Sequence, residues 1–149
     1  MINTPHDSVI VQSSGRFLIP LIQLFGLYVL FFGQYGPGGG FVGGVLLGAS
    51  LIAGLLIFGP DGTSSETARR VLKIDGFGLI IFAGIGGLCL IGGGEFLNYS
   101  SFSIPGIDDS TRRHVGIIVA QIGVALDIAV AAVSIVYSLS DQGEDGSDA

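Results

Sequence analysis

The chain has 149 residues, of which 49% are hydrophobic and only 12% are charged, and its mean hydropathy is +0.73. A soluble domain averages about 25% charged residues, so this composition is typical of a membrane protein with a single domain. The formal net charge of −6 argues against nucleic acid as a partner, because nucleic-acid-binding proteins carry basic patches. Residues 1–15 contain no Lys or Arg, so we do not expect a signal peptide there.

Four stretches are long and apolar enough to cross a bilayer, which takes about 20 mostly apolar residues in a helix. We expect the spans at about 17–33, 38–59, 76–97 and 116–139. None of them alternates apolar and polar residues as the strands of a membrane barrel do. The prediction is therefore an all-α integral membrane protein, with one four-helix transmembrane domain over 1–140 and an acidic, disordered tail over 141–149.

The passage 33–44, GQYGPGGGFVGG, joins the first two expected spans, and seven of its twelve residues are glycine. Proline suits the first position of a helix, so we predict that the second helix begins near Pro37 and that the passage forms a tight helical hairpin. Gly40, Gly44 and Gly48 recur every four residues and so share one face. Small residues on such a face let helix backbones touch in lipid. The predicted helix-packing motif consists of Pro37, Gly38, Gly39, Gly40, Phe41, Gly43, Gly44 and Gly48.

Two other interpretations of this passage stay open. In the first, its glycines are merely tolerated, as they often are in membrane helices. In the second, part of the segment is re-entrant backbone that lines a water-filled cavity, which membrane proteins permit where protein encloses it.

Between the second and third spans, Thr63 and Glu66 have the spacing of a capping box, and Glu66 can pair with Arg70 four residues later. This pattern predicts a short surface helix. The third span is rich in glycine and holds the chain's one cysteine, Cys89, which is expected to be a small core residue. So much small-residue surface indicates a subunit whose grooves are filled by other helices.

Asp127 lies close to the middle of the fourth span, where a charge costs roughly 2.5–3.5 kcal/mol on insertion scales. At 100° per residue its face also carries Ala120, Gly123, Ala131 and Ser134, which are small and typical of a face packed against protein. Two hypotheses remain for this carboxyl group. It belongs to a cation or proton path, or it is a neutral acid that is hydrogen-bonded to a neighbouring helix.

Four further polar residues are weaker candidates for the same path: Glu95, Gln34, Gln121 and His114. A solvated carboxylate at the membrane interface is the favoured interpretation of Glu95, and an interfacial cap that of His114. Gln121 is inside a span, where such a group more often bonds another helix. The chain has no catalytic constellation and no metal-ligand cluster, so we expect neither an enzyme nor a cofactor.

The distribution of basic residues predicts the orientation of the chain. Cytoplasmic loops carry more Lys and Arg than external ones. The side that holds the termini has Arg16, Arg69, Arg70 and Lys73, whereas the other side has Arg112 and Arg113. Both termini are therefore expected in the cytoplasm.

The stretch LFGLYVLFFGQYGPGGGFVGG resembles the signature of the MnhB (or MrpB) family, whose members are small subunits of the Mrp-type multisubunit cation/proton antiporters. In that family G-H-x-x-P-G-G-G-F-x-G-G follows the first span. The match covers Gly33, Pro37, Gly38, Gly39, Gly40, Phe41, Gly43 and Gly44. Two positions depart from the family. Its histidine is Gln34 here, and an acidic residue that it often carries just before Gly123 is Gln121.

The resemblance implies a small membrane subunit that packs with large antiporter-like subunits and other small ones, in a complex that exchanges Na+ for H+ across the cell membrane. Similar subunits occur in membrane-bound hydrogenase and related respiratory complexes, and this alternative stays open. A second alternative is an independent homo-oligomeric channel, although the spans hold few polar residues for a pathway of their own.

Overall fold

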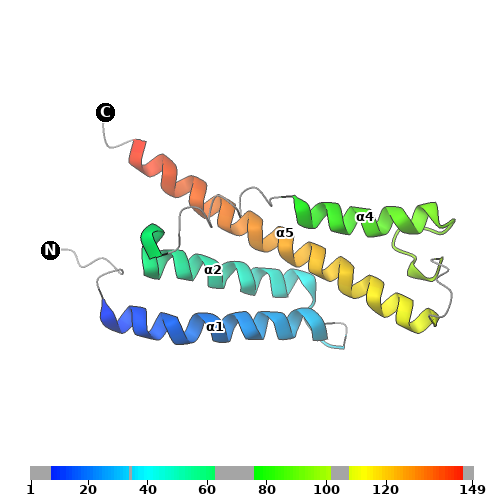
Figure 1. Cartoon of the computed structure of the whole chain (residues 1–149), viewed down its shortest axis with the longest axis horizontal. Helices are drawn as coiled ribbons and strands as arrows, with labels where there is room; N and C mark the ends of the chain where they lie inside the picture. The colour runs from blue at the N-terminus through cyan, green and yellow to red at the C-terminus, as the bar shows by residue number, and fades with distance from the viewer. Residues whose placement is uncertain (1–7, 34, 63–75, 102–107, 146–149) are drawn as a thin grey trace.

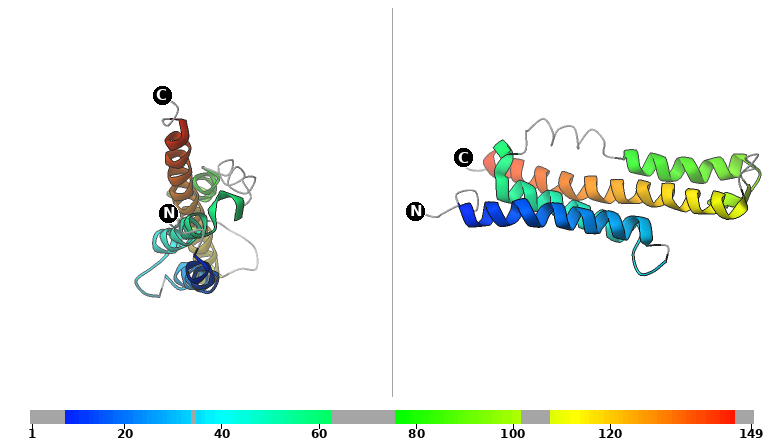
Figure 2. Two further views of the ribbon diagram at one scale, coloured as in Figure 1. Left: turned by 90° about the vertical axis from the view of Figure 1, so that its left-hand side faces the viewer. Right: turned by 60° about the horizontal axis from the view of Figure 1, so that its bottom comes forward.

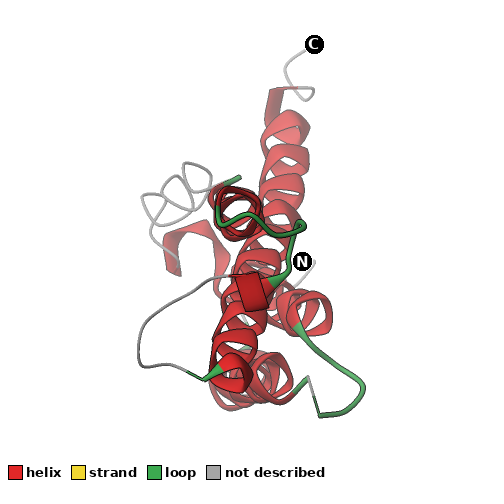
Figure 3. Ribbon diagram, turned by 90° about the vertical axis from the view of Figure 1, so that its right-hand side faces the viewer, coloured by secondary structure: helices red, strands yellow, loops and turns green. Residues whose placement is uncertain are grey.

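The computed structural model describes residues 8–33, 35–62, 76–101 and 108–145, and every regular element in these ranges is a helix (Figure 3). The elements are α1 (Val9–Phe32), α2 (Gly40–Gly62), α4 (Phe77–Ile91), the short 3-10 helix η2 (Tyr99–Ser101) and α5 (Asp109–Asp145). This confirms the all-α prediction. The surface helix predicted around Thr63, Glu66 and Arg70 lies outside the described residues.

Helices α1 and α2 form a hairpin, and α2 lies between α1 and α5 (Figure 1). Helix α2 runs parallel to α5, whereas α1 and α4 run in the opposite direction. The beginning of α1 and the end of α5 therefore lie at the same end of the molecule (Figure 2). The buried apolar core is narrow and comes mainly from small residues of α5: Ala120, Ala125, Ala129, Val130 and Val133.

The α1–α2 hairpin and α4 lie beside different parts of α5. In Figure 1 and in the right-hand view of Figure 2, α1 and α2 lie beside the C-terminal part of α5, whereas α4 lies beside its N-terminal part. The molecule is consequently long and stepped, and α5 contacts both parts.

Within the described ranges, three helical segments are long and apolar enough to cross a membrane: Val9–Phe32, Gly40–Phe58 and Asp109–Leu139. The fourth, α4, has 15 residues and is about 22 Å long. This helix is shorter than the predicted span 76–97. Gly92 is the C-cap, Gly93 has a φ of +83°, and the N–H groups of Gly93 and Gly94 donate to the carbonyls of Leu90 and Cys89. This pattern of two bonds with a left-handed glycine ends a helix.

Two helix starts also differ from the predictions. Helix α1 begins at Val9, eight residues before the predicted 17. Helix α2 begins at Gly40 rather than near Pro37, because Gly39 has a φ of +109°, a left-handed conformation that a right-handed helix cannot include. Pro37 therefore lies in the connecting turn.

Candidate functional site

Asp127 lies on the side of α5 that faces the first turn of α4. A Cβ added to Gly78 would lie 2.9 Å from the Cβ of Asp127, and one added to Gly123 would lie 2.8 Å from the carbonyl oxygen of Gly78. The two helix backbones touch here because neither glycine has a side chain. Asp127 is half-buried, and it forms no hydrogen bond or ion pair with any residue that the structure describes.

The first turn of α4 lies beside Asp127. The N-cap residue, Gly76, has no side chain to bond the free N–H groups of that turn. A helix N-terminus carries roughly half a positive charge, and a nearby carboxylate is stabilised by it. A carboxyl group inside a membrane span can bind a monovalent cation, exchange a proton or form a hydrogen bond with a neighbouring helix.

The glycine face of α2 packs on α5 of the same chain. A Cβ on Gly44 would lie 2.8 Å from both the Cα and the carbonyl oxygen of Ala125, and one on Gly48 would lie 3.2 Å from the Cα of Ala129. A Cβ on Gly40 would collide with the backbone of Gln121. The two helices therefore meet through matching four-residue repeats, 40–44–48 on α2 and 121–125–129 on α5.

The other residues of the predicted packing motif lie in the hairpin itself. A Cβ on Gly43 would lie 3.0 Å from the Cβ of Leu30 in α1, and one on Gly38 would lie 2.9 Å from Cγ1 of Val29. The N–H of Gly39 donates to the carbonyl of Val29 at 3.2 Å and so ties the turn to α1. Phe41 is 66% exposed and Pro37 is also exposed. Their side chains are thus not packed inside this chain.

The weaker candidates lie apart from Asp127. Glu95 is exposed in the turn after α4, and His114 is exposed near the start of α5. Gln121 is half-buried on the α2 side of α5, about 120° around the helix from Asp127 at 100° per residue. Gln34 lies outside the described residues. Among those residues, no group of three or more His, Cys, Asp or Glu could hold a metal ion.

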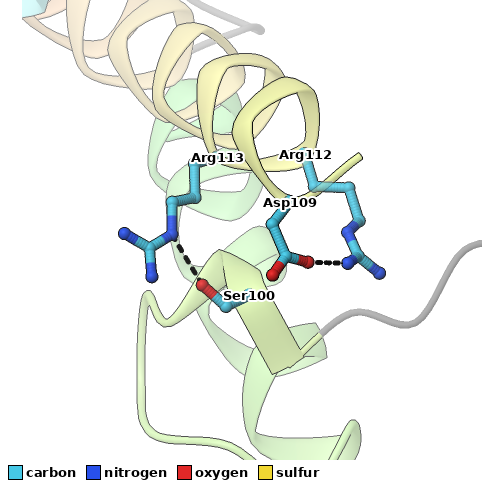
Figure 4. A network of polar contacts seen from close by, with 4 residues as sticks. All are labelled: Ser100, Asp109, Arg112 and Arg113. Carbon is cyan, nitrogen blue, oxygen red and sulfur yellow. Dashed lines mark hydrogen bonds and ion pairs between the residues drawn. The ribbon is translucent and has the colours of Figure 1, made fainter. Parts of the chain in front are cut away.

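A polar contact ties η2 to the first turns of α5 (Figure 4). Nε of Arg113 donates to Oγ of Ser100 at 2.6 Å, and Arg112 pairs with Asp109 on the same helix. One residue before Ser100, the ring of Tyr99 packs where a Cβ on Gly116 would lie. Burial, and then the nearby Cys89, raise the pKa of the Tyr99 phenol, so it stays neutral at physiological pH. Cys89 itself is 1% exposed, which confirms that it is a small core residue.

Gly78 is a contact residue that the sequence did not single out. It is one glycine among many in an apolar run, and no motif or spacing distinguishes it from Gly84 or Gly87, around which the structure leaves open space. Only the position of α5 shows that Gly78 must stay small.

We expect Gly78→Ala to loosen α4 from α5. The added methyl group would lie 2.5 Å from the backbone nitrogen of Asp127, and such overpacking typically costs about 1–3 kcal/mol. Thermal unfolding of the purified protein should occur at a lower temperature. The matched control is Gly84→Ala on the same helix, which meets no atom within 4 Å and should leave stability unchanged or slightly raised. Equal behaviour of the two variants would contradict the α4–α5 contact.

Known proteins resemble the chain over most of its length. A family model described as a domain related to the MnhB subunit of Na+/H+ antiporter matches residues 10–135. The B-type subunit of the Na+/H+ antiporter of Alkalihalophilus pseudofirmus OF4 is 31% identical over 86% of this chain and 94% of its own. That of Bacillus subtilis 168 is 25% identical over 82% of this chain and 90% of its own. No solved structure was found to match.

Proposed function

The chain belongs to the MnhB family and is the MnhB-type subunit of a multisubunit Na+/H+ antiporter, and from this premise we propose that it contributes one carboxylate to the cation and proton path and one packed hairpin to the assembly. The observation that carries the proposal is Asp127, a half-buried acid in the middle of α5 without a hydrogen bond or ion pair to the described residues. A carboxylate in lipid is costly unless it has a partner. We propose that the bound cation, a proton or a group on another subunit is that partner.

The proposed partners are the large antiporter-like subunits and the other small membrane subunits of the complex. The outer surfaces of this chain suit such neighbours, since α1 presents a row of exposed aromatic side chains in which Tyr28 and Phe32 stack with ring centroids 4.9 Å apart. The aqueous Na+ and H+ on either side are the transported ions, and lipid covers what other subunits leave exposed.

The test of the path is transport by the intact complex with Asp127 replaced. The test of the partners is purification from native membranes. The chain should co-purify with the other antiporter subunits in constant ratio. A stable homo-oligomer that conducts ions by itself would contradict the proposal.

We expect both termini in the cytoplasm. The start of α1 and the end of α5 lie at one end of the molecule, and Arg112 and Arg113 lie near the other end of α5 (Figure 1). Alkaline phosphatase fused after Ala149 should be inactive, and a fluorescent protein fused there should fluoresce. Alkaline phosphatase fused after Asp108, which precedes α5, should be active. The reverse pattern would invert the orientation and leave the fold unaffected.

A further inference from the structure

The turn of the α1–α2 hairpin packs on α5 but does not reach the N-terminal end of α5. A Cβ on Gly39 would lie 3.8 Å from Nε2 of Gln121, and Gly40 contacts the backbone of the same residue. Gln121 follows Arg113, the last arginine before the apolar part of α5, by eight residues, which is about 12 Å along the helix. The turn therefore stands roughly 12 Å short of the charged end of α5.

The part of α5 between Arg113 and Gln121 lies at the depth of the hydrocarbon, and α4 provides the evidence for this. It extends from the contact of Gly78 with Gly123 towards the charged end of α5, where Tyr99 meets Gly116. Its 15 residues include no charge, and its side chains are exposed, for example Ile80 at 67% and Ile91 at 85%. An apolar surface of this kind is not stable in water. Lipid or a neighbouring membrane subunit must therefore cover α4, which places α4 and the level of Gln121 within the hydrocarbon region.

The hairpin turn consequently places polar backbone below the membrane surface. Tyr35, Gly36, Pro37 and Gly38 are exposed, and the N–H groups of Gly36 and Gly38 form no backbone hydrogen bond with described residues. Irregular backbone does not face lipid within the hydrocarbon region. It is found there only where protein encloses it or where water reaches it.

We propose that residues 35–39 and Gln121 form the floor of a water-filled recess that opens on the side of the membrane opposite the termini. Helices α4 and α5 provide one wall, and neighbouring subunits of the complex provide the others. Water in the recess hydrates the free peptide groups of the turn. It also brings hydrated cations roughly 12 Å closer to the centre of the membrane than the charged end of α5. The recess depends only on the depth of the turn, so it stands whether or not Asp127 transports anything.

Cysteine labelling of the intact complex tests the recess. Cys89 is replaced by alanine, and single cysteines are introduced as Gly36→Cys, Ser110→Cys and Leu79→Cys. Gly36 has no atom within 4 Å of an added Cβ, Ser110 is exposed at the start of α5, and Leu79 is 58% exposed on α4. Each variant is treated with a small charged methanethiosulfonate and with a maleimide that carries a long polyethylene glycol chain. The parent without an added cysteine gives the background.

We expect Ser110→Cys to react with both reagents, because it marks the surface. Leu79→Cys should react with neither, because a thiol in lipid does not form the reactive thiolate. Gly36→Cys should react with the small methanethiosulfonate but not with the long maleimide, since a recess admits only small molecules. Reaction of Gly36→Cys with both would place the turn at the surface, and reaction with neither would show that another chain or lipid fills the space. Either result would overturn the proposal. Transport need not be measured, so the outcome is separate from the role of Asp127.

Discussion

An antiporter complex that carries Asp127→Asn or Asp127→Ala is expected to exchange Na+ for H+ much more slowly while it keeps all its subunits. The carboxylate is half-buried beside the first turn of α4 and has no hydrogen bond or ion pair with the described residues. A contact between a charged group and its partner contributes about 1.5–3 kcal/mol. Its loss therefore slows exchange by about 10- to 100-fold if the contact forms in the rate-limiting state.

The two variants separate transport from structure. If Asp127 were a neutral acid bonded to a neighbouring helix, asparagine would keep that bond and support normal exchange, whereas alanine would weaken assembly. Exchange should be measured in everted vesicles as the recovery of a pH gradient on adding Na+, normalised to the amount of assembled complex. The control is Asp108→Asn, which removes an exposed carboxylate before α5. Normal exchange with both Asp127 variants would exclude a path role.

Replacing Gly44 by leucine is expected to remove this chain from the membrane or to leave it unassembled. The first atom of the new side chain would lie 2.8 Å from the Cα and the carbonyl oxygen of Ala125. Backbone cannot move aside as a side chain can, so the cost should reach or exceed the upper part of the usual range of about 1–3 kcal/mol for overpacking. In lipid this close packing is the main attraction between the helices, because burial of apolar surface adds little there.

The control for Gly44→Leu is Gly54→Ala on the same helix. A Cβ on Gly54 meets only Cδ1 of Ile19, at 3.8 Å, so Gly54→Ala should be tolerated. Gly40→Leu, one turn before Gly44 on the same face, should fail as Gly44→Leu does. The measurement is the amount of this chain that co-purifies with its partners, together with the melting temperature of the complex. Normal assembly with leucine at both positions would rule out the α2–α5 contact.

The sequence by itself determined the features that depend on short stretches of chain. The apolar runs predict membrane helices because each helix satisfies its own backbone hydrogen bonds, whatever its neighbours are. The glycine repeat 40–44–48 marks a close-packing face for a similar reason, since four-residue spacing alone puts its members on one side. The isolated acid at position 127 is likewise visible in an apolar run without any structure.

Only the tertiary structure decided which faces meet and at what depth. It showed that the glycine face of α2 packs on α5 of the same chain, that Gly78 contacts α5 beside Asp127, and that α4 and the hairpin lie along different lengths of α5. The run Gly92–Gly94 looked like the continuation of a span, but it ends α4. Pairing of membrane helices depends on close contact between surfaces far apart in the sequence, and small apolar residues look alike until those surfaces are brought together.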